Sequence, residues 1–414
     1  MNKKIGRIFK GDKVVWMVFF FLCMISVVEV FSASSHLTYK SHNYIGPIVY
    51  HSGMIIVGLV VAVVTLNIPC RYFKLMTPFL MLVSALTLVG VLIFGQSING
   101  ANRVISLFGL TFQPSEIAKG TIVLATAQIL SAMQRENGAD GQAFKWIMWI
   151  TVPACVLIGL ENLSTAALLF LVVIVMMFIG HVPGRQLGRL VGGITAVGLV
   201  GVMMVLLVGQ EPVSQEPANV AKTEKVAKSS GKSKGVLHRM GTWKGRILKF
   251  TRPEVPPGEY DLDKDAQEAH ANIAIVSSGI VGKGPGKSVE RDFLSQAFSD
   301  FIYAIVIEEL GIVGAMFVVM LYVILLYRAA RISSRCENNF PAFLVMGLAL
   351  LLVVQATFNM MVAVGIVPVT GQPLPLISKG GTSTIINCAY VGAILSVSRS
   401  AKMKDDKAQK KLSV

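Results

Sequence analysis

Three carboxylates stand where a polar loop meets an apolar run. Asp300 comes just before the run, and Glu308 and Glu309 lie inside it. Ionisable side chains in such a run are costly, so each requires a partner or a function. On a helix, Glu308 would lie about 12 Å deeper than Asp300. We expect the two glutamates to anchor the helix inside a bundle and Asp300 to face water, where it can exchange protons. An N-cap role for Asp300 is a structural alternative compatible with this one.

A charged pair begins an earlier apolar run. The stretch QPSEIAK (113–119) places Pro114 in the first turn of a predicted helix, where its missing amide costs nothing. Glu116 and Lys119 then share one helix face, because they are three residues apart. The pair could line a functional cavity, or it could be an ion pair that only holds the bundle together.

Two further stretches offer cations to an anionic ligand. Arg103 lies in a predicted outer loop, where it could meet a lipid head group. Between Leu237 and Phe250, large apolar residues recur near helical spacing among basic residues that include Arg239 and Arg246. This pattern is typical of an interfacial helix, although a solvated basic face would explain it equally well.

Three prolines break any helix within GIVPVTGQPLPLISKGGTS (365–383), which also contains Lys379. Non-helical backbone at membrane depth persists only where protein or water satisfies its polar groups. We therefore expect this stretch to form a wall of a water-accessible cavity, with an ordinary outer turn as the alternative.

The stretch GKGPGKS (282–288) has the composition of a phosphate-binding loop. That motif needs glycine five residues before Gly286, and Val281 stands there instead. No buried strand precedes it, so a glycine-rich turn is the better interpretation. The five cysteines and six histidines form no CxxC or HExxH pattern, so the sequence indicates no metal site and no disulfide framework.

Composition indicates a polytopic membrane protein. Of 414 residues, 53% are hydrophobic and 15% are charged, against roughly 25% charged in soluble domains. The mean hydropathy is +0.64. Repeated apolar runs predict an all-α bundle of about ten transmembrane helices. The runs lie at about 14–30, 47–66, 75–94, 114–133, 145–160, 164–180, 187–209, 301–327, 341–364 and 383–398.

The basic residues predict the topology. Of 38, 20 lie in the two tails and in the short loops of one side, whereas only Lys40 and Arg103 lie in short loops opposite. Both termini are therefore expected in the cytoplasm. The net charge of +15 is then a topology signal rather than a sign of nucleic-acid binding. The N-terminal run resembles a signal peptide, but its length favours a retained first helix.

This topology divides the chain into four parts. Residues 1–209 hold seven transmembrane helices and 301–398 hold the last three, followed by a basic cytoplasmic tail at 399–414. Residues 210–300 form one long extracytoplasmic loop. Its Lys-rich part has few large apolar residues and is expected to be disordered.

Four motifs in order carry a family resemblance: NGANRVI (99–105), QPSEIAK (113–119), SDFIYAIVIEELG (299–311) and PLPLISKGGTS (373–383). On ten spans they resemble the SEDS family of cell-wall polymerases, and more its FtsW-type division members than its RodA-type elongation members. The resemblance implies a peptidoglycan glycosyltransferase that polymerises lipid II on the outer face of the cytoplasmic (inner) membrane, at the division septum. It also implies a class B penicillin-binding protein and other division proteins as partners.

The resemblance carries over to single residues. Asp300 matches the essential family aspartate, and Glu116 and Lys119 match polar residues of the family's central cavity. Joining two sugars requires a base for the acceptor hydroxyl and cations for the departing pyrophosphate. Asp300 is then the base, and Arg103 and Lys119 are candidates for the pyrophosphate.

Arg239 and Arg246 are further candidate pyrophosphate contacts, and a divalent cation (Mg²⁺ or Mn²⁺) is an optional aid. Two functions from other classes fit the same residues. One is a transporter that flips lipid II, because ionisable residues between spans suit transport as well. The other is a noncatalytic division scaffold, which would need none of the acids.

The chain departs from the family pattern in three places. Arg103 matches the second arginine of a Gly-Ala-Arg-Arg-Trp pattern, but Asn102 and Val104 replace its neighbours. Lys379, a candidate substrate contact, stands where the family usually has tyrosine. The residues ENLST at 161–165 replace a family Gln-Pro-Asp-Leu-Gly-Thr.

Overall fold

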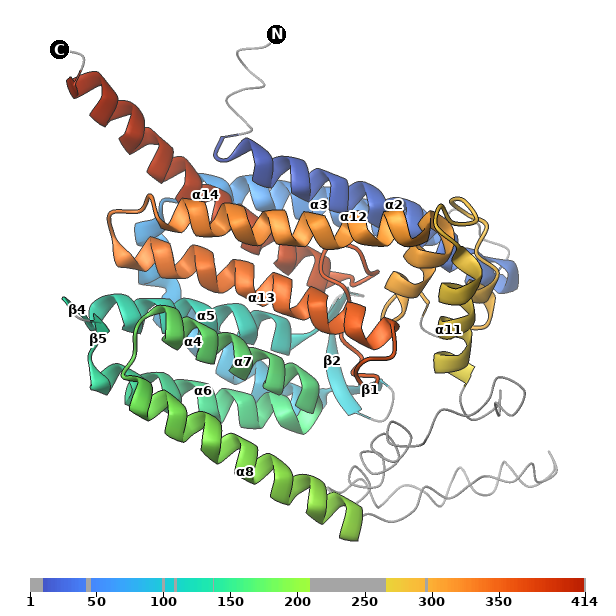
Figure 1. The fold of residues 1–414 in the computed structure, drawn as a ribbon, viewed down its shortest axis with the longest axis horizontal. Coiled ribbons are helices and arrows are strands. Elements are labelled where there is room, and N and C mark those ends of the chain that lie inside the picture. The colour runs from blue at the N-terminus through green and yellow to red at the C-terminus, as the bar shows by residue number, and fades with distance from the viewer. Residues whose placement is uncertain are drawn as a thin grey trace.

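The computed structural model describes residues 10–41, 46–98, 101–107, 110–136, 138–208, 266–294 and 297–412. Long helices dominate these residues and run side by side as a bundle (Figure 1). The helices are α2 (Lys13–Ser41), α3 (Gly46–Asn67), α4 (Cys70–Phe94), α5 (Pro114–Ala132), α6 (Gly141–Glu161), α7 (Leu163–Ile179), α8 (Gly184–Val208), α11 (Ala266–Ser278), α12 (Ile302–Ser333), α13 (Asn339–Ala363) and α14 (Thr382–Leu412), with a 3₁₀ turn, η1, at Glu290–Asp292.

The predicted all-α membrane bundle is confirmed, because every one of the ten apolar runs forms a helix. Six helices in the described part of the chain are long and apolar enough to cross a membrane. The apolar helix α7 is shorter, at 17 residues. The sequence did not predict the short antiparallel sheet between α4 and α5, formed by β1 (Gln96–Ile98), β2 (Ala101–Leu107) and β3 (Leu110–Phe112), or the hairpin of β4 (Gln134–Arg135) and β5 (Gly138–Ala139).

Local sequence signals account for several helix ends. Pro114 occupies the first turn of α5, as predicted. The side chain of Asp140 accepts a hydrogen bond of 3.1 Å from the amide of Gln142 and caps α6. Asn162 caps α7 in the same way, through the amide of Ser164. These caps satisfy amides that have no partner inside their own helix.

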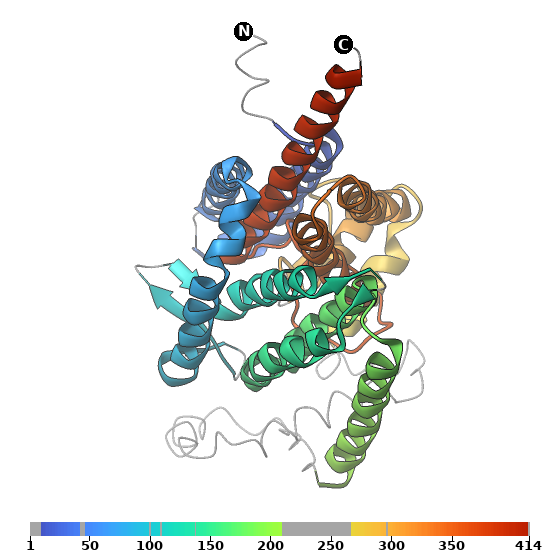
Figure 2. The same ribbon diagram turned by 90° about the vertical axis from the view of Figure 1, so that its left-hand side faces the viewer.

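The centre of the bundle is built from α5, α12, α13 and α14, and α14 packs along α3 (Figure 2). Helix α14 approaches α5 closely because Gly120 has no side chain, and a Cβ there would clash with the ring of Tyr390. At the edge of the bundle, α8 contacts α7 and presents many exposed apolar side chains. Such a surface suits contact with lipid.

The start of α2 and the end of α14 lie at one end of the bundle, together with the β4–β5 hairpin (Figure 1). Helix α11 lies at the opposite end, next to the start of α12. This is the arrangement expected for an even number of passes. The assignment of these two ends to the cytoplasmic and outer faces stays a prediction, as do the four predicted parts of the chain.

Candidate functional site

Asp300 lies in the turn that leads into α12, and its side chain is half-buried. The hydroxyl of Ser299 donates a hydrogen bond of 3.1 Å to Oδ1 of Asp300. Phe301 occupies the N-cap position of α12 and makes no side-chain capping bond. Asp300 immediately precedes the residue at the N-cap position.

One face of α13 holds this turn. The amide nitrogen Nδ2 of Asn359 donates to the carbonyl oxygen of Asp300 at 2.9 Å and to that of Gln372 at 2.7 Å. One helical turn away, Nε2 of Gln355 donates to the carbonyl oxygen of Pro373 at 3.0 Å. Both amides are buried. Helix α13 thus fixes the backbone at Asp300 and the loop that follows α13.

The same face of α13 reaches the charged pair of α5. Lys119 Nζ lies 2.8 Å from Oε1 of Glu116 and donates to Oε1 of Gln355 at 2.6 Å. The exposed fractions of the Lys119 and Glu116 side chains are 0% and 1%. The predicted ion pair therefore exists inside the protein, and Gln355 and Asn359 join it to the turn of Asp300.

The stretch between α13 and α14 is non-helical, as its prolines predict, and residues 374–378 are buried. Protein groups satisfy its backbone. The hydroxyl of Tyr322 donates to the carbonyl of Pro375, and that of Ser26 donates to the carbonyl of Ile377 at 2.7 Å. Ser378 donates to the carbonyl of Ser299 at 2.7 Å. The stretch is thus part of the bundle interior and not an ordinary outer turn.

Lys379 lies beside the same turn. Its amide donates to the carbonyl of Phe298 at 3.0 Å, and its Nζ lies 5.1 Å from the centroid of the Phe298 ring. Burial lowers the pKa of the Lys379 ammonium, because the charged form loses hydration. The structure therefore places a half-buried cation beside the turn of Asp300, next along the chain to Ser378, which bonds the carbonyl of Ser299.

The structure describes the remaining predicted cations only in part or not at all. Arg103 lies in β2, and its backbone alone is described. Arg239 and Arg246 lie outside the described residues, as does the predicted interfacial helix at 237–250. Across the ranges that the structure describes, no three His, Cys, Asp or Glu side chains gather as a metal ion would require. These residues give no donor set for the optional divalent cation, so no step is assigned to it.

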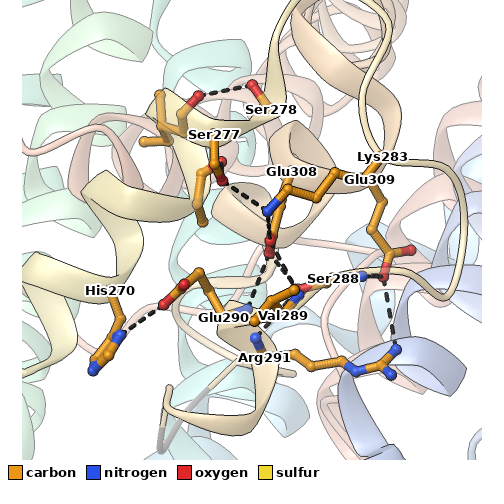
Figure 3. A network of polar contacts seen from close by, with 12 residues as sticks. His270, Ser277, Ser278, Lys283, Ser288, Val289, Glu290, Arg291, Glu308 and Glu309 are labelled. Atoms are coloured by element: carbon orange, nitrogen blue, oxygen red, sulfur yellow. Dashed lines mark hydrogen bonds and ion pairs between the residues drawn. The ribbon is translucent and has the colours of Figure 1, made fainter.

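The side chains of Glu308 and Glu309 are fully buried, as expected for an anchor inside the bundle, and they bind residues 283–291, a segment that the sequence did not name as their partner (Figure 3). Glu308 Oε1 accepts from Lys283 Nζ at 2.6 Å and from the amide of Val289 at 3.0 Å. Its Oε2 accepts from the hydroxyl of Ser288 and from the amide of Glu290 at 3.4 Å. Glu308 therefore ties residues 283–290 to α12 from a fully buried position.

Glu309 completes a clamp, by which we mean the bonds that join residues 283–291 to Glu308 and Glu309. Its carboxylate accepts from the amides of Gly286 at 2.8 Å and Ser288 at 3.2 Å, and from the hydroxyl of Ser32. Nη1 of Arg291 lies 4.0 Å from Oε1 of Glu309. The GKGPGKS stretch thus does use backbone amides to hold an anion, but the anion is a carboxylate of the same chain.

Sequence reasoning missed Gln355 and Asn359. The available signal was two amide side chains four residues apart in an otherwise apolar run, which puts both on one helix face. It also missed the clamp on Glu308 and Glu309, because no local sequence pattern shows which residues about 20 positions apart are in contact.

The family of cell cycle proteins that includes FtsW, RodA and SpoVE matches residues 12–403. Curated relatives fall into two groups. The peptidoglycan glycosyltransferase MrdB of Escherichia coli (strain K12) is 28% identical over 95% of this chain and 94% of its own. The probable peptidoglycan glycosyltransferase FtsW of Halomonas elongata is 30% identical over 94% of this chain and 91% of its own.

Solved structures show the same fold. A chain of a peptidoglycan synthase complex that coordinates polymerization and crosslinking aligns with a TM-score of 0.67 at 24% identity, over 94% of this chain and 98% of that one. The rod shape determining protein RodA of Thermus thermophilus aligns with a TM-score of 0.63 at 23% identity, over 94% and 97% of the two chains.

Proposed function

Since this chain belongs to the family of FtsW, RodA and SpoVE cell cycle proteins, we propose that it is a peptidoglycan glycosyltransferase that polymerises lipid II with Asp300 as the general base. It is a multi-pass integral membrane protein, and the reaction would take place at the outer face of the cytoplasmic membrane. One observation carries the proposal. A single face of α13 fixes both the turn of half-buried Asp300 and the buried pair of Lys119 and Glu116.

Asp300 has the features of a base for a sugar hydroxyl. The acceptor hydroxyl oxygen would form a bond to the anomeric carbon of the donor as the bond from that carbon to the pyrophosphate breaks. The proton of the hydroxyl would pass to the Asp300 carboxylate. The bond from Asn359 holds the backbone of Asp300, and the bond from Ser299 helps to orient its carboxylate, so the base would be held in a fixed position beside the substrate.

The departing pyrophosphate needs positive charge. Lys119, whose ammonium group bonds Glu116 and Gln355, is the first candidate. Lys379 lies beside the turn of Asp300 and is a second candidate. Arg103, Arg239 and Arg246 are proposed as further contacts on the strength of their positions in the sequence. Cations preset at the leaving group stabilise the transition state without reorganisation.

We further propose a role in cell division, with a class B penicillin-binding protein as the partner. The motif pattern supports division, while relatives named MrdB and FtsW are similar to the chain at nearly the same identity. The fold shared with a chain from a solved peptidoglycan synthase complex supports a partnered enzyme.

The direct test uses the purified protein, its penicillin-binding partner and labelled lipid II. Glycosyl transfer predicts labelled glycan strands that lengthen with time. A lipid II transporter would move labelled lipid across a vesicle membrane without forming strands, and a noncatalytic scaffold would do neither. Absence of strands from a folded complex would therefore reject the proposal.

A further inference from the structure

Helix α12 is broken at Gly311, whose backbone has φ 70° and ψ −173°. In an unbroken helix the amides of Ile312 and Val313 would donate to the carbonyls of Glu308 and Glu309, four residues earlier. The break leaves these two amides and two carbonyls without those partners. Buried in a membrane protein, four such groups would need partners elsewhere.

The turn after α11 supplies all four partners. Ile312 donates to the carbonyl of Gly279 at 3.4 Å, and Val313 donates to that of Ile280 at 3.3 Å. In the other direction, the amide of Lys283 donates to the carbonyl of Glu308 at 3.0 Å, and that of Gly284 donates to the carbonyl of Glu309 at 2.8 Å. The turn is therefore inserted into the broken helix, and its register against α12 is fixed by backbone bonds.

Glycine permits this close contact. Gly282 and Gly311 both have positive φ, and a Cβ on either would clash with the backbone of the other segment. The insertion also fixes which side chains of the turn lie next to which side chains of α12.

The side chains around the insertion are apolar and exposed. On the turn and the end of α11, the exposed fractions are 85% for Val276, 71% for Ile280 and 79% for Val281. Beside them on α12, Ile312 and Val313 are also exposed. The exposed apolar surface continues along α12 through Met316, Met320 and Val323. The patch on the turn is thus continuous with the lipid-facing side of a candidate membrane span.

The length of α12 places this patch at membrane depth. The basic residue Arg328 marks the inner end of the apolar part of the helix. Val313 lies 15 residues from it, or about 23 Å at 1.5 Å per residue. The hydrocarbon core is about 30 Å thick, so the inserted turn lies within its outer part.

We propose that residues 276–281 insert into the acyl chains of the outer leaflet, so that the end of α11 and the turn after it form a shallow re-entrant element. The occupant of the exposed patch is lipid hydrocarbon, because the patch continues the lipid-facing surface of α12. The bilayer would then hold the 282–291 segment, which clamps Glu308 and Glu309, against the helix that begins just after Asp300. This inference rests on α12 spanning the membrane and not on glycosyl transfer.

Collision accessibility of spin labels in proteoliposomes tests the insertion. In a background with the five native cysteines replaced by alanine, single labels are placed at Val276 and at Val281. Met316 on α12 serves as the lipid-facing reference and Lys287, on the exposed loop, as the water-facing reference. Labels at 276 and 281 are expected to collide several-fold more with oxygen than with a polar nickel chelate, as at 316, whereas the label at 287 shows the reverse.

Two outcomes would overturn the proposal. A preference for the nickel chelate at 276 and 281 would place the turn in water. Low accessibility to both reagents would mean that protein covers the patch, either a second copy or another chain. If the label at Val281 prevents assembly, the label at Val276 gives the same decision, because its side chain projects from α11 and lies outside the backbone insertion.

Discussion

Asn359→Leu tests whether α13 positions the turn of Asp300. The substitution keeps a side chain of similar volume but removes the donor that serves the carbonyls of Asp300 and Gln372. The bond to Gln372 is buried and that to Asp300 is partly buried, so the unsatisfied carbonyl of Gln372 alone would cost about 1–3 kcal/mol of folding free energy. By comparison, two hydrogen bonds of the average strength measured between membrane helices would predict a loss of only about 1 kcal/mol of folding free energy. We therefore expect a clear loss of thermal stability and a fall in turnover larger than the fall in substrate affinity.

The matched control is Thr357→Val on the same helix. Thr357 is exposed, and its hydroxyl donates to the carbonyl of Val353 in its own helix at 2.9 Å. Losing that bond leaves the Asp300 turn untouched, so stability and turnover should stay near the parent values. The measurements are thermal unfolding of the purified protein and glycan-strand synthesis with its partner. If Asn359→Leu matched the control in both, the assigned role of α13 would be refuted.

Three further predictions concern the topology, the buried pair of Glu116 and Lys119, and the clamp on Glu308 and Glu309. A cysteine placed at Ser230 should react with a membrane-impermeant reagent on intact spheroplasts, and reaction only after permeabilisation would reverse the topology. Glu116→Leu and Lys119→Leu should each lose expression or polymerase activity, because either leaves a partner charge buried at a cost of at least about 2.5 kcal/mol; full activity in both would remove them from the site. Lys283→Met should speed proteolysis of the outer segment by releasing Glu308, and an unchanged cleavage rate would show that the backbone amides suffice.

The sequence was sufficient for the ten helices of the apolar runs, because apolar length reports directly on membrane spans, but it did not predict α11 or η1. It was also sufficient for the pair of Glu116 and Lys119, because their contact is set by a spacing of three residues on one helix. The short sheet at β1–β3 was missed because strands of three to seven residues carry little periodic signal.

The long-range contacts could not be predicted in the same way. Gln355 meets Lys119 across 236 positions, and Asn359 meets Asp300 across 59. Helical periodicity says which face of α13 these amides occupy, but not which element packs against that face. The GKGPGKS stretch was interpreted as a glycine-rich turn, and only the fold shows that its amides at Gly286 and Ser288 bind the carboxylate of Glu309.

Asp300→Asn tests the central claim most directly, because it keeps the size of the side chain and removes the base. The variant should fold, bind its partner and lose roughly 10²- to 10⁴-fold of the glycan-strand rate. A structural role alone, such as a lost cap, would cost only about 1 kcal/mol of stability. Glu136→Gln, an exposed carboxylate on the β4–β5 hairpin at the other end of the bundle, controls for loss of charge. Strand synthesis by Asp300→Asn at near the parent rate would contradict the account and favour lipid II transport or a scaffold.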